Sequence, residues 1–527
     1  MPSKWTVRRG APPQPTRRTI LSYGAATLGL PLFSCATARP YAGTQADPFS
    51  LGVASGDPDS TSVVLWTRLA PEPLANDGGM PNASVLVQWD LAHDDRMRTI
   101  VATGAVIAAP ELGHSVHVEV TGLEPDRWYW YRFRTGTTES PVGRTRTLPA
   151  PQAAAARLSF VAASCQSFEQ GLFTAYGHMA KEDIDLIVFL GDYIYEYEKG
   201  AQGKVRSHYG GECKTLQDYR TRYAQYRTDP LLRRMHERCP WIVTFDDHEV
   251  ANNYAGGIPA KGERELAAFA ARRAAAYQAY WENMPLRASA LPRSAAISLY
   301  RAFTWGTLAE FFVLDTRQFR TDQPNGDGVS AINSAALDPA ATMLGSTQKD
   351  WLKAGLKASA AKWNVLAQQV MMGMVDQHAR PPAPARYKMD QWPGYAHERM
   401  ELARFLAEQR VQNPIVLTGD IHSAWCNELR VDDRDMSTPV VATEFVTTSI
   451  SSGGDGADAP KNAAQLLAAN PLVKFHNLQR GYLRCTVTRE QWRSDYVVVD
   501  RVEKAGGQSS TRASLVVNAG DPRVHPA

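Results

Sequence analysis

The pattern of hydrophobic and polar positions divides the chain into an all-β part followed by an α/β part. From Asp47 to Pro149, short apolar segments are separated by clusters of Gly, Pro, Asn and Asp. In Ser115–Val120, which reads SVHVEV, valine recurs at every second position, as is typical of a strand with one buried face. We therefore predict a small N-terminal β-sandwich over residues 47–149.

After a linker rich in Pro and Ala, longer apolar runs alternate with helical stretches. The runs predicted to be buried strands are Ser159–Ala163, Asp185–Leu190, Trp241–Phe245 and Asn413–Thr418. Helices are predicted over residues 263–283, 347–358 and 399–409, where good helix formers are frequent. The alternation predicts an α/β domain over residues 157–505, followed by a C-terminal tail at 506–527.

Residues 1–38 have the features of an export signal. The apolar run at 20–36 is interrupted by Gly and Pro and is short for a membrane span. The preceding residues 16–21, TRRTIL, resemble a twin-arginine signal, with an ordinary secretory signal as the alternative. Residues 36–38 fit a cleavage site, whereas the residues around Cys35 resemble a lipoprotein box. We expect a periplasmic or extracellular chain that is attached to a membrane only if Cys35 is lipidated.

Composition changes this picture mainly through the cysteines. A formal charge of +3, with 44% hydrophobic and 21% charged residues, describes an ordinary globular protein and gives no sign of a nucleic-acid partner. We expect a monomer. In an oxidising compartment, Cys213 could pair with Cys239 and Cys426 with Cys485. Four buried free thiols are the alternative.

Three of the predicted strands end close to acidic residues. Asp192 and Asp420 each follow a glycine at the end of an apolar run, and Asp246 and Asp247 follow a third run directly. In α/β domains such side chains collect beyond the carboxyl ends of the strands. A single Asp after a strand is often a helix cap, but crowded carboxylates repel one another and require a cation. The sequence therefore predicts a metal site.

Donors of other kinds accompany these carboxylates. They are Cys165, Tyr195, His248 and His422. Tyr195 lies three residues after Asp192, and His422 lies two residues after Asp420, so that both side chains of the second pair project to one side of an extended segment. Alone, each donor would be an ordinary core or surface residue. Together they offer oxygen, nitrogen and sulfur to a metal.

The segments that carry these donors resemble those of the alkaline phosphatase D (PhoD) family. Five blocks occur in the order expected for the family: ASCQSFEQGLFTAYGHMAKEDIDLIVFLGDYIYEYE, TFDDHEVANNYAGG, VLDTRQFR, VLTGDIHSAW and EFVTTSISSGG. GDYIY, DDHE and GDIH are also similar to motifs of purple acid phosphatases, and the stretch VTGLEPDRWYWYRFRTG is similar to fibronectin type III modules. The resemblance implies an α/β metallophosphoesterase sandwich of two sheets flanked by helices, preceded by a fibronectin-like all-β domain.

The resemblance also implies a site with one Fe3+ ion and Ca2+. The expected metal ligands are Cys165, Asp192, Tyr195, Asp247, Asp420 and His422. Asn253 is a further expected ligand through its amide oxygen, with Asn252 as the alternative and phosphate as the alternative partner. Asp192 would bridge the metals. Asp247 and Asp420 stand where purple acid phosphatases have Asn and His, and their carboxylate oxygens suit Ca2+. Phenolate and thiolate must be deprotonated to bind, which a trivalent ion favours.

The implied activity is that of an alkaline phosphatase. It would hydrolyse phosphomonoesters, and also diesters if the site admits them, through attack by a metal-bound hydroxide or oxide. The alternative is a phosphodiesterase or phospholipase D that acts on lipid or nucleic-acid diesters. A non-catalytic binding protein is a third hypothesis.

Several residues have two open roles. His248, expected to be catalytic together with Asp192, would bind phosphate or protonate the leaving group. Its alternative is a structural hydrogen bond beneath the metals. Arg317 and Arg320 either contact substrate phosphate or pair with acidic loops such as that of Asp315.

Overall fold

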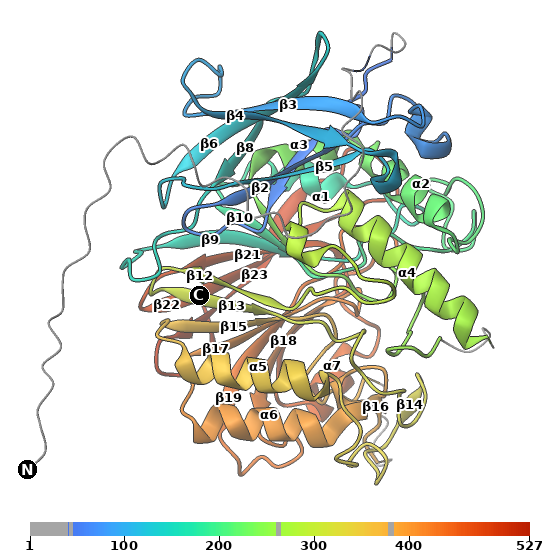
Figure 1. Cartoon of the computed structure of the whole chain (residues 1–527). Coiled ribbons are helices and arrows are strands. Elements are labelled where there is room, and N and C mark those ends of the chain that lie inside the picture. Colours follow the sequence, from blue (N-terminus) through green and yellow to red (C-terminus); the bar gives the residue numbers. More distant parts are fainter. Residues whose placement is uncertain (1–40, 42–45, 260–264, 378–383) are drawn as a thin grey trace, which may run out of the picture. The chain divides into compact units, whose positions relative to one another are not determined.

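The computed structural model describes residue 41 and residues 46–259, 265–377 and 384–527 (Figure 1). The predicted signal peptide and Cys35 lie outside these residues. Arg39–Ala527 form one compact unit. Among the helices described, none has both the length and the apolar character needed to cross a membrane.

The larger sheet has ten strands in the order β24-β23-β22-β21-β9-β10-β11-β1-β2-β5. They are β1 (Val53–Gly56), β2 (Val63–Arg68), β5 (Ser115–Val120), β9 (Leu158–Ala163), β10 (Leu186–Phe189), β11 (Trp241–Val243), β21 (Arg480–Val487), β22 (Gln491–Val499), β23 (Ser509–Asn518) and β24 (Val524–Pro526). β9, β10 and β11 pair in parallel and are buried on both faces, which explains their continuous apolar sequences.

The second sheet has seven strands in the order β12-β13-β15-β17-β19-β18-β20. They are β12 (Arg301–Trp305), β13 (Ala309–Val313), β15 (Trp363–Ala367), β17 (Pro414–Thr418), β18 (Ala424–Arg430), β19 (Val440–Val446) and β20 (Val473–Asn477). Side chains such as Phe160 and Leu186 of the first sheet share a core with Phe311 and Leu417 of the second. The two sheets therefore pack face to face.

Helices cover the outer faces of both sheets. α1 (Thr174–Met179), α2 (Leu216–Arg227), α3 (Pro230–Arg238) and α4 (Leu266–Asn283) pack against the ten-stranded sheet. α5 (Gly345–Ala358) and α6 (Ala396–Glu408) lie side by side on the seven-stranded sheet, and α7 (Ala463–Ala469) is a short helix before β20 (Figure 1). This arrangement confirms the predicted α/β fold of two sheets flanked by helices.

The N-terminal part is all-β, as predicted. A five-stranded sheet contains β3 (Val85–Ala92), β4 (Ile100–Ala108), β6 (Trp128–Thr135), β7 (Thr138–Glu139) and β8 (Gly143–Arg146). It packs on β1, β2 and β5 around a separate core. Since Gly56 of β1 pairs in parallel with Trp241 of β11, the N-terminal part also extends the ten-stranded sheet.

The remaining elements are short. β14 (Val329–Ser330) pairs with β16 (Tyr387–Lys388). Single 3-10 turns occur at Asn76–Gly79, Pro110–Leu112, Ala288–Ala290 and Trp392–Tyr395.

Three expectations from the sequence are wrong. The predicted tail at 506–527 supplies β23 and β24, because Leu515 and Val517 are buried between the sheets. The predicted disulfides are also wrong: Cys213, Cys239, Cys426 and Cys485 are buried free thiols. The thiols pack as small apolar groups, which is the alternative considered from the sequence. The helix predicted from residue 347 begins two residues earlier, at Gly345.

Candidate metal centre

The candidate metal centre lies where parallel strands of the two sheets end. Cys165, Asp192 and Asp247 follow the carboxyl ends of β9, β10 and β11. In the other sheet, β17 is parallel to β15 and β19 and is followed by Asp420 and His422. Since the carboxyl ends of parallel strands meet at the same edge, side chains from distant parts of the chain converge there.

Donor atoms at this edge form three overlapping groups. In each group, one donor atom of every residue lies within 4.8 Å of the others. The groups are Cys165, Asp192 and His422; Asp192, Asp247 and His248; and Asp246, Asp247 and Asp420. Asp192 and Asp247 each belong to two groups, so the three groups are continuous.

The backbone at many of these positions is in the left-handed region. The φ angle is 59° at Cys165, 56° at Asp192, 52° at Asn253, 63° at Asp420 and 57° at His422. A residue with a Cβ rarely adopts this conformation, which costs roughly 1–3 kcal/mol. The surrounding structure must therefore hold these residues in place.

One buried carboxylate, that of Glu249, joins the strand-end turns that follow β10 and β11. It accepts hydrogen bonds from the backbone N–H groups of Asp192 (3.1 Å), Asp246 (2.7 Å) and Tyr193. Gly191, with φ of 104°, permits this approach, since a Cβ there would lie 2.5 Å from the Cβ of Asp246. Burial, followed by the charge of Asp192, raises the pKa of Glu249 to about 8. No role was predicted for Glu249 from the sequence.

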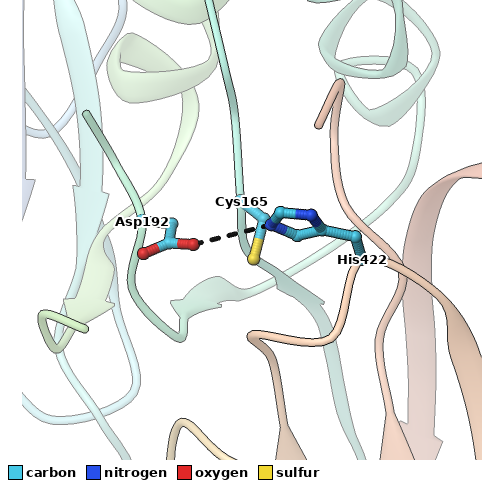
Figure 2. Close-up of side chains that lie close together, drawn as sticks. All are labelled: Cys165, Asp192 and His422. Atoms are coloured by element: carbon cyan, nitrogen blue, oxygen red, sulfur yellow. Dashed lines mark ion pairs between the residues drawn. The ribbon is translucent and has the colours of Figure 1, made fainter. Parts of the chain in front are cut away.

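Figure 2 shows the side chains of Cys165, Asp192 and His422 converging from three separate segments. His422 Nε2 lies 3.8 Å from Asp192 Oδ2. The hydroxyl of Tyr195 lies 2.9 Å from each of these two atoms. Ser452 donates a hydrogen bond of 2.7 Å to the Tyr195 oxygen. The structure therefore brings four of the expected metal ligands, Cys165, Asp192, Tyr195 and His422, into one group.

The thiol of Cys165 and the phenol of Tyr195 lose their protons only if a bound cation offsets the free-energy cost of burying their negative charges. Burial, followed by the charge of Asp192, raises the pKa of Cys165 and of Tyr195 well above their usual values. Burial also opposes the charge of Asp192, but His248 and His422 lower its pKa below the usual value. This donor set suits a strongly charged cation, which would stabilise thiolate and phenolate together.

His248 is held by Glu196, a residue for which no role was predicted. Its Nδ1 lies 2.8 Å from Glu196 Oε2, and its ring centroid lies 4.2 Å from that of Tyr195. Burial disfavours the charged ring, but Asp247, Glu196 and Asp192 raise the pKa of His248 well above its usual value. The structural hydrogen bond considered from the sequence is thus present at Nδ1, while Nε2 has no hydrogen-bond partner in the part of the chain that is described.

Arg317 is the central cation of the acidic group, which is formed by Asp246, Asp247 and Asp420. Its fully buried guanidinium contacts Asp246, Asp420 at 2.9 Å, Asp390 at 3.2 Å and Asp247 at 3.5 Å. Arg320 pairs with Asp390 at 2.9 Å. Both arginines therefore form ion pairs with acidic loops, which is one of the two roles considered for them. Asp315 is not an ion-pair partner of either arginine. Its carboxylate instead accepts the backbone N–H of Arg317.

The acidic group retains unsatisfied oxygens. Asp192 Oδ1 and Asp246 Oδ2 are buried and have no hydrogen-bond partner among the residues described. With its nitrogen turned toward the carboxylate oxygens of Asp247 and Asp390, the amide of Asn253 donates hydrogen bonds to them at 3.2 and 3.3 Å. The unpartnered oxygens of Asp192 and Asp246 are the acceptors that fit a cation. Oxygen donors at this end suit a hard cation, whereas sulfur, phenol and imidazole lie at the other end.

Comparisons with known proteins agree with this geometry. The model of the PhoD-like phosphatase family matches residues 160–496, and the model of the PhoD-like phosphatase N-terminal domain matches residues 34–149. Alkaline phosphatase D of Bacillus subtilis (strain 168) is 52% identical over 473 residues, which are 89% of this chain and 80% of that protein. A solved structure described as PhoD superposes with a TM-score of 0.90 at 50% identity and covers 92% of this chain and 93% of the other.

Proposed function

Because the chain belongs to the PhoD-like phosphatase family, we propose that it is an alkaline phosphatase that hydrolyses phosphomonoesters at the strand-end metal centre. The observation that carries the proposal is the continuity of the three donor groups, which share Asp192 and Asp247. This arrangement suits adjacent cations that hold one phosphate group between them.

The donor chemistry supports different cations at the two ends of the centre. Cys165, Tyr195 and His422 would hold Fe3+, and Asp192 would lie between the metals. Asp247, Asn253 and Asp420 would hold Ca2+ through oxygen. When bound, these cations would polarise the phosphate oxygens and generate the attacking nucleophile.

Residues of the chain itself would orient the ester and complete the charge balance. One ring nitrogen of His248 lies within 4.8 Å of donor atoms of Asp192 and Asp247, and Nδ1 is already bonded to Glu196, so that Nε2 would bind the phosphate or protonate the leaving alcohol. Arg317 and Arg320 lie behind the carboxylates, where they offset negative charge and would not contact substrate. The partly exposed His422, whose side chain is 35% accessible, marks the side from which substrate would enter.

The test is phosphate release by Asp192→Asn. We expect at least a hundredfold lower kcat on p-nitrophenyl phosphate, since one shared ligand and its charge are lost. Asp435→Asn, at an exposed loop, is the matched control and should match the wild type. Elemental analysis and the visible absorption spectrum of the wild type would identify the metals. Full activity of Asp192→Asn would contradict the proposal.

A substrate panel decides between monoesters and diesters. We expect p-nitrophenyl phosphate to be hydrolysed faster than bis(p-nitrophenyl) phosphate, phospholipid or DNA. A reversed preference would instead establish the diesterase alternative at the same centre.

We also propose that the chain is exported as a monomer through the twin-arginine route, with residues 1–38 as the signal. The motif at 16–21 supports this assignment. Replacing Arg17 and Arg18 by Lys should leave the precursor inside the cell. Export that is unchanged by this replacement would contradict the proposal.

A further inference from the structure

Glu196 uses both of its carboxylate oxygens on neighbours of the metal centre. Oε2 lies 2.8 Å from Nδ1 of His248, and Oε1 accepts the backbone N–H of Asn252 at 2.8 Å. The Glu196 side chain is 2% exposed and that of His248 is 9% exposed. A buried carboxylate with two donors has a fixed orientation, and it fixes the hydrogen-bonded ring in turn.

Two tyrosine rings also contact the imidazole ring of His248. The ring of Tyr195 lies at 4.2 Å between centroids with an interplanar angle of 32°, and that of Tyr197 lies at 5.2 Å. Both tyrosines flank Glu196 in the sequence, so one short segment supplies the hydrogen bond to Nδ1 and both of these ring contacts. With Nδ1 bonded to Glu196, Nε2 is the nitrogen left for a ligand.

We propose that Glu196 is a positioning residue that acts through His248, because it keeps Nε2 directed at the phosphate ester between the metal ligands. The proposal rests on the proposed phosphatase activity and adds a residue that contacts neither substrate nor metal. Without Glu196 the ring would lose its only hydrogen bond in the described structure and would rotate about its side-chain bonds. The substrate would then lose a contact, while the metal ligands would keep theirs.

A double-mutant cycle on kcat tests this dependence. We expect Glu196→Ala to lower kcat on p-nitrophenyl phosphate by about 10- to 100-fold, with a smaller change in KM. We expect His248→Ala to lower it at least as much. Because Glu196 acts through His248, the double variant should be no slower than His248→Ala alone. Glu196→Gln keeps one acceptor oxygen, so it should recover part of the loss.

Three further measurements separate positioning from a general structural effect. Glu198→Ala, an exposed glutamate in the same segment, is the matched control and should leave kcat unchanged. The iron and calcium contents of Glu196→Ala should equal those of the wild type. A crystal structure of this variant should show the His248 ring rotated.

Losses of kcat that multiply in the double variant, or an unmoved ring in Glu196→Ala, would overturn the positioning role while the phosphatase activity stands. Loss of bound metal in Glu196→Ala would also overturn it. If the wild-type protein carries its metals but releases no phosphate from any ester, the proposed function is wrong. The positioning role of Glu196 is then wrong as well.

Discussion

Replacing Arg317 by methionine is expected to destabilise the metal-free protein strongly. The guanidinium group has no solvent exposure and contacts Asp246, Asp390 at 3.2 Å and Asp420 at 2.9 Å. Methionine fills similar space but has no charge, so these carboxylates lose their shared cation. The pKa of Asp246, which burial already raises well above its usual value, would rise further.

The magnitude depends on which carboxylates keep another partner. Asp390 retains Arg320, and Asp420 retains Gln391 at 3.3 Å. Asp246 loses the hydrogen bond to its Oδ1, and its Oδ2 is already without a partner within the described ranges. The substitution therefore leaves one buried carboxylate without compensation. Removing one partner of a buried ion pair lowers the free energy of unfolding by about 3–5 kcal/mol.

Thermal unfolding in the presence of a chelator measures this loss. The midpoint of Arg317→Met should fall by on the order of 5 °C. Arg512→Met is the control, since Arg512 is 46% exposed and pairs with Asp458. Exposed pairs contribute about 0–1 kcal/mol. Added Ca2+ should stabilise Arg317→Met more than the wild type, because a bound cation replaces the missing charge. A midpoint for Arg317→Met within about 1 °C of the wild type in chelator would refute this reasoning.

Two further predictions concern the strand-end turns and the acidic group. Gly191→Ala should lower the unfolding midpoint and the metal content, because its Cβ would lie 2.5 Å from the Cβ of Asp246 and 2.6 Å from its backbone nitrogen. Gly211→Ala, with nothing within 4 Å, is the control, and equal behaviour of the two variants would contradict the steric argument. For Asp420, burial raises the folded pKa from 3.8 to about 6, so this carboxyl contributes stability below pH 3.8 that is lost as the pH rises through 6. Since cations bind the carboxylate form, calorimetric titration should show tighter Ca2+ binding at pH 7 than at pH 5, and equal affinities would count against a ligand role.

Local sequence patterns were sufficient for the strands that carry the site. The apolar runs before Asp192, Asp247 and Asp420 form β10, β11 and β17, because a strand buried on both faces needs apolar side chains at every position. The short motifs after these runs identified the donors that the structure brings together. The resemblance to a known family added the expected arrangement of two sheets.

The surroundings of the donors could not be predicted in this way. Glutamate and arginine usually lie at the protein surface. Only the structure shows that Glu196, Glu249 and Arg317 are buried. Arg317 and Asp246, for example, are 71 positions apart in the chain. The strands at the C-terminus were missed for the same reason, and the free thiols were considered only as the alternative to disulfides.

The sequence by itself determined the periodicity of its strands and the kinds of donor at their ends, because both are properties of neighbouring residues. The tertiary structure alone decided which charged groups are buried, which of them pair, and which side chain holds His248. Burial and pairing depend on segments far apart in the chain, and the free energy of a charge depends on both.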